Sequence, residues 1–106
     1  MLRDEHLTIF IAEQDGTPAA TCMLILTPNL TRGARPFGTI ENVVTRADMR
    51  GRGLGKLVLA AACEKAWQAG AYKVMLMTGS KRESTLAFYE AAGFTRGKTA
   101  FEMRRP

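Results

Sequence analysis

The segment of this sequence best suited to chemistry is Arg50-Gly51-Arg52-Gly53-Leu54-Gly55-Lys56. Glycine residues let the backbone turn sharply and present consecutive N–H groups to an anion. Four basic residues and one acidic residue lie between positions 46 and 56, so this stretch carries a local charge of +3. The segment therefore predicts a binding site for phosphate groups. The alternative is a glycine-rich turn whose basic side chains are merely solvated.

The spacing of the glycines excludes two common phosphate-binding loops. A P-loop requires glycine at position 50 and serine or threonine at position 57, where this chain has Arg50 and Leu57. The dinucleotide motif G-x-G-x-x-G fails because the third glycine arrives one residue early. The remaining pattern is R-x-x-G-x-G, formed by Arg50, Gly53 and Gly55.

A strand and a helix must position this loop. Residues 37–45 read as a β-strand, and from Gly53 to Gly70 the apolar residues recur with the period of an α-helix. Residues 72–77 form a short apolar run suited to a buried strand. The order strand, helix, strand makes the two strands parallel. The loop thus lies at a strand-to-helix junction, where the helix N-terminus favours an anion.

Further elements complete a mixed α/β fold. Residues 7–13 and about 19–26 read as two strands joined by a hairpin turn at Asp15-Gly16. Ser80 and Glu83 have the spacing of a capping box, which opens a helix that Gly93 closes. Residues 95–104 read as one or two further strands. The sequence therefore predicts a single α/β domain, residues 1–106, built on a mixed (α+β) sheet.

Two blocks of the sequence resemble one protein family. The R-x-x-G-x-G pattern matches the coenzyme A signature of the GNAT family of N-acetyltransferases, and the run 87–94, A-F-Y-E-A-A-G-F, matches the family's FYE…GF motif. The runs I-E-N-V-V, R-G-R-G-L-G and F-Y-E-A-A-G-F are closest in pattern to the glucosamine-phosphate N-acetyltransferase branch and unassigned bacterial relatives. Asn42 stands where that branch has aspartate. The resemblance implies the GNAT acyl-CoA N-acyltransferase fold.

The resemblance also implies acetyl-CoA as the co-substrate and no metal. In the family, the pantetheine arm pairs with the strand that corresponds to residues 40–45, and the pyrophosphate meets the backbone of residues 51–56. The residues that it implies in coenzyme binding are Val43, Val44, Thr45, Arg50, Gly51, Arg52, Gly53, Leu54, Gly55, Lys56, Thr85 and Tyr89.

Two side chains are candidates for proton transfer. Tyr89 stands in the family's general-acid position, and a tyrosine with a pKa of about 10 holds its proton at pH 7 for the departing thiolate. Glu41 lies on the strand beside the expected thioester. The resemblance to enzymes of the amino-sugar branch implies that Glu41 takes the amine's proton, directly or through water. The alternatives are a packed aromatic ring for Tyr89 and an ordinary salt bridge for Glu41. These roles imply direct acetyl transfer to a primary amine of a small molecule, without an acyl-cysteine on Cys63.

The composition argues against several other classes of protein. Cys22 and Cys63 form no CxxC pair and His6 is the only histidine, so a zinc site or a disulfide framework lacks ligands. The longest apolar run, residues 57–63, is too short to span a bilayer, which predicts a cytoplasmic protein without membrane contact. The net charge of +5 would suit a nucleic-acid module, but coenzyme phosphates account for the positive run.

The start of the chain leads to two further expectations. The family normally has another strand and two helices before the position of Leu7, and we expect this chain to lack them. Without that neighbour the strand at 7–13 leaves a hydrophobic sheet edge, which predicts a two-fold homodimer. Because those helices usually help to form the acceptor pocket, the alternative function is a shortened, catalytically weak protein that binds coenzyme A or a partner without turnover.

Overall fold

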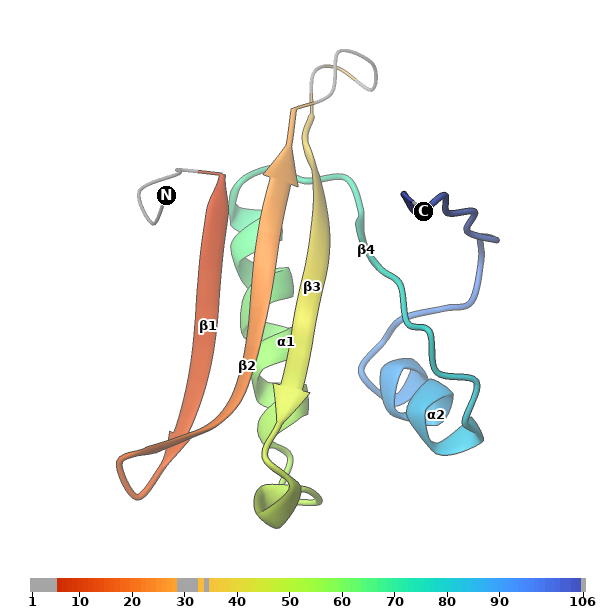
Figure 1. Cartoon of the computed structure of the whole chain (residues 1–106). Helices are drawn as coiled ribbons and strands as arrows, with labels where there is room; N and C mark the ends of the chain where they lie inside the picture. The colour runs from red at the N-terminus through yellow and green to blue at the C-terminus, as the bar shows by residue number, and fades with distance from the viewer. Residues whose placement is uncertain (1–5, 29–32, 34, 106) are drawn as a thin grey trace. The chain divides into compact units, whose positions relative to one another are not determined.

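The computed structural model describes residues 6–28, 33 and 35–105. The chain divides into two compact units, Met1–Leu76 and Met77–Pro106. The first unit contains β1 (Leu7–Gln14), β2 (Thr17–Thr27), β3 (Phe37–Thr45), a short 3-10 helix (Ala47–Met49), α1 (Leu54–Gln68) and β4 (Val74–Leu76), and the second contains α2 (Glu83–Ala91) (Figure 1). No helix in the described ranges is long and apolar enough to cross a membrane.

The first unit is built on a four-stranded sheet in the order β1-β2-β3-β4. The pairs β1-β2 and β2-β3 are antiparallel, and β3-β4 is parallel. Asp15 and Gly16 have φ values of 53° and 78°, the left-handed backbone that a tight hairpin turn requires. The predicted hairpin, the mixed sheet and the parallel pairing of the strands on either side of α1 are confirmed.

Helix α1 covers one face of this sheet, as Figure 1 shows. The core on this face consists of small and aliphatic side chains from the helix and the strands: Ala12, Ala20, Cys22, Leu24, Ile40, Val58, Leu59, Ala62 and Ala66. The helix approaches β3 closely at Gly38, where an added Cβ would lie 3.0 Å from Leu24 Cδ1 and 3.5 Å from Ala66 Cβ. This close approach lies near the start of β3 and the end of α1.

Strand β3 contains a bulge at Asn42 that the alternation of residues 37–45 does not predict. Met23 of β2 pairs with Glu41, whereas Thr21, two residues earlier in β2, pairs with Val44. One extra residue of β3 therefore lies between these pairs. Asn42 has a φ of 54°, a left-handed conformation that asparagine tolerates better than most other residues. Such a bulge bends the strand and increases its twist.

Strand β4 is shorter than the predicted strand at 72–77. It spans only Val74–Leu76 and pairs with residues 38–40 of β3. The bulge that follows in β3 explains the early end of this ladder, because the bent strand leaves the line along which a straight partner would continue.

The second unit begins with a turn rather than with the predicted capping box. Helix α2 starts at Glu83 with Arg82 as its N-cap, and its cap has no side-chain hydrogen bond, so the prediction that Ser80 opens this helix is wrong. The Ser80 hydroxyl instead accepts a hydrogen bond from the Arg82 N–H (3.3 Å) and donates one to Thr85 Oγ1 (3.2 Å). Serine hydroxyls often form such local bonds in place of a helix cap. Gly93, with a φ of 103°, follows the helix as predicted.

The predicted strands in residues 95–104 are also wrong. These residues are all described and none of them lies in a strand. Phe101 and Met103 are 94% and 97% exposed. Alternating apolar residues form a stable strand only where a partner covers them, and no described segment pairs with these residues.

Candidate functional site

The glycine-rich segment lies where the sequence predicts it, between β3 and α1. Gly51 and Gly53 have φ values of 83° and 76°, which glycine adopts without strain. A Cβ added to either residue would meet no atom within 4 Å. The loop therefore presents open backbone, with room for a ligand beside both glycines.

The N-terminus of α1 provides donors for an anion. Gly53 is the N-cap residue, and the first helical hydrogen bond runs from the Leu57 N–H to the Gly53 carbonyl oxygen (3.0 Å). The N–H groups of the first turn, from Gly53 to Lys56, precede that bond and have no acceptor within the helix. The first turn contains no acidic residue. These donors and the helix dipole together favour an anion at this end of α1.

Basic side chains surround this helix end. Arg50, Arg52 and Lys56 are all exposed. Arg46, four residues before Arg50, forms an ion pair with Asp48 (2.9 Å), and this pair adds no net charge. The remaining cations account for the local charge of +3 that the sequence indicates.

The end of β3 offers backbone groups to an extended ligand. Beyond Ile40, β4 no longer pairs with β3, while Val44 and Thr45 still pair with β2 on the other side. Among the strands that the structure describes, none occupies the β4 side of β3 there. Val43 is half-buried, and Arg50 Nε donates to the Thr45 carbonyl oxygen (3.4 Å), which links the loop to the strand end. A chain that carries amide groups can add to such an edge through main-chain hydrogen bonds.

Glu41 points away from α1. Its neighbour Ile40 is buried against the helix, and side chains alternate along a strand, so the Glu41 carboxylate lies on the opposite face of the sheet, where it is exposed. Glu41 forms no ion pair with any residue that the structure describes. The described residues therefore do not support the alternative of a salt bridge. The carboxylate is therefore accessible to a ligand that approaches this face.

The other predicted site residues, Thr85 and Tyr89, lie on α2 in the second unit. The half-buried Tyr89 ring packs edge-to-face against Phe88 (5.1 Å between ring centroids) and Phe94 (6.4 Å). Burial raises the pKa of the Tyr89 hydroxyl above its usual value, so this group holds its proton at neutral pH. Thr85 accepts the hydrogen bond from Ser80. Both the acid and the packed-ring interpretations of Tyr89 fit this environment.

The cysteines are poor nucleophiles. Cys22 Sγ donates to the Val58 carbonyl oxygen (3.5 Å), and burial, with a smaller effect of Cys63, raises the pKa of Cys22 to about 11. Burial also raises the pKa of Cys63. Because the thiolate is the reactive form, neither thiol is activated at neutral pH. Within the described ranges, no cluster of His, Cys, Asp or Glu side chains could hold a metal ion.

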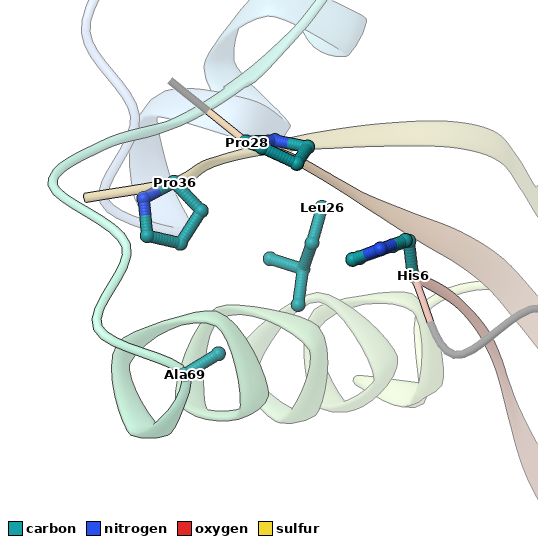
Figure 2. Close-up of a pocket in the computed structure, with 5 residues that line it drawn as sticks. All are labelled: His6, Leu26, Pro28, Pro36 and Ala69. Atoms are coloured by element: carbon teal, nitrogen blue, oxygen red, sulfur yellow. The ribbon is translucent and has the colours of Figure 1, made fainter. Parts of the chain in front are cut away.

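A pocket of about 300 Å³ lies at the opposite end of α1 (Figure 2). It is lined by His6, Leu26, Pro28, Pro36 and Ala69. Ala69 is the C-cap of α1 whereas Gly53 is its N-cap, and a helix of 15 residues is about 22 Å long. The pocket contains none of the predicted site residues and is separate from the loop.

Comparison with known proteins places these features in a family. A model of the acetyltransferase (GNAT) family matches residues 1–94. Over 86 residues the chain is 38% identical to glucosamine 6-phosphate N-acetyltransferase of Trypanosoma brucei brucei, a match that covers 81% of this chain and 56% of that protein. The chain therefore spans little more than half the length of this relative.

Solved structures show the same fold. A structure assigned as an acetyltransferase of Agrobacterium tumefaciens strain C58 is 50% identical, with a TM-score of 0.95 over 99% of this chain and 73% of that one. Glucosamine-6-phosphate N-acetyltransferase of Arabidopsis thaliana is 27% identical, with a TM-score of 0.85 over 93% of this chain and 67% of that one. The predicted fold and the resemblance are confirmed. By its family match and its relatives, this chain belongs to the GNAT family of acetyltransferases.

Proposed function

We propose that this protein binds acetyl-CoA and transfers the acetyl group directly to a primary amine of a small molecule. The observation that carries the proposal is the junction of β3 and α1, where left-handed Gly51 and Gly53 leave open space at a helix N-terminus. The first-turn N–H groups donate to the pyrophosphate, and the helix dipole favours an anion by about 0.3–2 kcal/mol. Arg50, Arg52 and Lys56 add charge-assisted contacts to phosphates.

In the same proposal the end of β3 binds the pantetheine arm. Val43, Val44 and Thr45 present backbone on the side that β4 leaves open. Pairing of the pantetheine amides with this edge directs the thioester towards Glu41. Bound acetyl-CoA supplies the activated acetyl group.

In this proposal Glu41 and Tyr89 transfer the protons. The exposed Glu41 carboxylate accepts the proton of the amine, directly or through water, and Tyr89, whose pKa is raised by burial, donates to the departing thiolate. At pH 7, deprotonating a lysine-type amine of pKa 10.4 costs about 4.6 kcal/mol, but an amine near pKa 8 costs only about 1.4 kcal/mol. A single carboxylate therefore suits an amine of low pKa.

The edge of the sheet supports a proposed two-fold homodimer. β1 is the terminal strand of the sheet, and its Ile9 and Ile11 side chains are 46% and 55% exposed. An apolar edge strand pairs readily with an identical strand, and a two-fold axis closes such a contact.

The test of the proposed function is product formation. The purified protein is mixed with acetyl-CoA and a panel of primary amines that includes glucosamine 6-phosphate, which the names of two relatives indicate. Mass spectrometry is expected to detect an N-acetyl product together with free coenzyme A. Calorimetric binding of acetyl-CoA without acetylation of any amine would instead support the alternative of binding without turnover, and absence of binding would overturn the proposal.

A further inference from the structure

One arginine of the second unit binds both ends of α2. Arg96 Nη2 donates a hydrogen bond to Glu83 Oε1 (3.1 Å) and another to Glu90 Oε1 (3.1 Å). Glu83 is the first residue of the helix, and Glu90 lies in its last turn. Seven residues are almost two full turns, so the two glutamates lie on the same side of α2, and their backbones are about 10 Å apart along its axis. We call these three residues the Arg96 bridge.

Between α2 and the bridge the chain turns back onto the helix. Gly93 has a φ of 103°, and its N–H donates to the Glu90 carbonyl oxygen (3.0 Å). The Phe94 N–H donates to the Tyr89 carbonyl oxygen (3.1 Å), and the rings of these two half-buried residues pack edge-to-face, with 6.4 Å between their centroids. Phe94 is therefore held between the turn at Gly93 and the bridge at Arg96.

The Tyr89 ring has a second aromatic neighbour. Phe88, from the same helix, packs edge-to-face against it with 5.1 Å between centroids. Tyr89 precedes Glu90 by one residue, or about 100° around the helix, so the bridge lies beside the ring rather than on it. Any influence of the bridge on Tyr89 therefore passes through Phe94, the ring that follows the helix.

We propose that Arg96 is a positioning residue for Tyr89: by joining Glu83 to Glu90 it holds Phe94 against the Tyr89 ring and so fixes the direction of the hydroxyl. The inference rests on the proposed function in that Tyr89 donates its proton to the thiolate. A general acid works only within hydrogen-bond reach of the group that it protonates, so a ring with more freedom transfers its proton more slowly.

The alternative is a set of solvated ion pairs without effect on Tyr89. The side chains of Arg96, Glu83 and Glu90 are 53%, 82% and 48% exposed, and a single exposed ion pair stabilises a protein little. The bridge differs from a single pair because one guanidinium joins two carboxylates from opposite ends of a helix. The exposed pair of Arg104 and Glu102 (3.5 Å) joins residues only two positions apart and connects no separate elements.

Arg96→Gln tests the proposal because it removes both ion pairs and keeps a polar side chain. We expect kcat to fall by about three- to tenfold, the range that two exposed pairs can supply, while the KM for acetyl-CoA is unchanged. Arg96→Lys keeps the charge without the planar guanidinium and should recover part of the loss. Arg104→Gln is the matched control and should retain the wild-type kcat. A wild-type kcat in Arg96→Gln would overturn the proposal.

A double-mutant cycle separates positioning of Tyr89 from a general structural role. If Arg96 acts through the Tyr89 hydroxyl, Arg96→Gln lowers kcat in the wild-type protein and has no further effect in Tyr89→Phe. An equal fall in both backgrounds would assign Arg96 a structural role and contradict the proposal. Urea denaturation of each variant establishes that the comparison is made between folded proteins.

Ring contacts provide a readout that needs neither coenzyme nor turnover. In protein with ¹³C-labelled tyrosine and phenylalanine, the nuclear Overhauser effect between the Tyr89 and Phe94 rings should be strong in the wild type and in Arg104→Gln, and weak in Arg96→Gln. If the wild type acetylates no amine but this weakening occurs, the proposed function fails and the hold of Arg96 on Tyr89 stands. If the ring contacts of wild type and Arg96→Gln are the same, the positioning role is wrong.

Discussion

The Leu57 N–H donates a hydrogen bond to the carbonyl oxygen of Gly53, its N-terminal neighbour by one helical turn, at 3.0 Å. This bond marks the first closed turn of α1, so the N–H groups before it remain available to a ligand. Gly53 also has the left-handed backbone that turns the chain from the loop into the helix. Gly53 thus stands at the point where the chain turns into the helix and where the unpaired donors begin.

Gly53→Val should weaken acetyl-CoA binding by at least about tenfold, or about 1.4 kcal/mol. Valine disfavours a φ of 76°, and its side chain would occupy the open space beside the backbone. Gly70→Val is the matched control, since Gly70 has a φ of 85° at the other end of α1. Calorimetry measures both affinities. If the Gly53→Val protein bound acetyl-CoA as tightly as wild type, the loop would not be part of the binding site.

Tyr89→Phe should lower kcat by about 10² to 10⁴ with little change in acetyl-CoA affinity, because the hydroxyl acts only as the thiolate departs. Since burial raises the pKa of Tyr89, the wild-type rate should not fall on the alkaline side until the pH exceeds about 10. Tyr72→Phe, at the other tyrosine, is the control. Steady-state kinetics measures kcat of these proteins across pH. Full turnover by Tyr89→Phe would show that Tyr89 is a packing residue and not the general acid.

Asn42→Val should reduce the free energy of unfolding by about 1–3 kcal/mol, because a β-branched residue resists the left-handed backbone of the bulge. Asn42→Gly should cost much less, since glycine adopts that conformation freely. Urea denaturation compares the two proteins. Equal stability of the two variants would show that the bulge does not depend on the conformation of residue 42.

The proposed dimer predicts a light-scattering mass near twice 11.6 kDa at micromolar concentration. Ile11→Lys should shift the protein towards the monomer, because a lysine on an edge strand opposes pairing with a second edge. Gln68→Lys on α1 adds the same charge away from the edge and should leave the mass unchanged. A wild-type mass near 11.6 kDa that does not rise with concentration would refute the dimer.

Local patterns predicted much of the fold correctly. The Asp15-Gly16 turn, the strand at 37–45 and the period of α1 all depend on neighbours in sequence, and the structure contains each of them. The loop at 50–56 is likewise local, because glycines at a strand-to-helix junction define its backbone.

Features that depend on pairing were not predictable in the same way. The bulge adds one residue at Asn42, and only the tolerance of asparagine for left-handed backbone hints at it. Residues 95–104 alternate like a strand but have no partner in the described structure, and Ser80 uses its hydroxyl in a turn.

The most direct test of the account follows backbone amide signals by NMR while acetyl-CoA is added to ¹⁵N-labelled protein. The account predicts the largest shifts at residues 51–56, where the first turn of α1 binds the pyrophosphate, and at residues 42–45, where β3 pairs with the pantetheine arm. Shifts confined to other segments, such as the pocket around Leu26 and Ala69, or no shifts at millimolar acetyl-CoA, would contradict it.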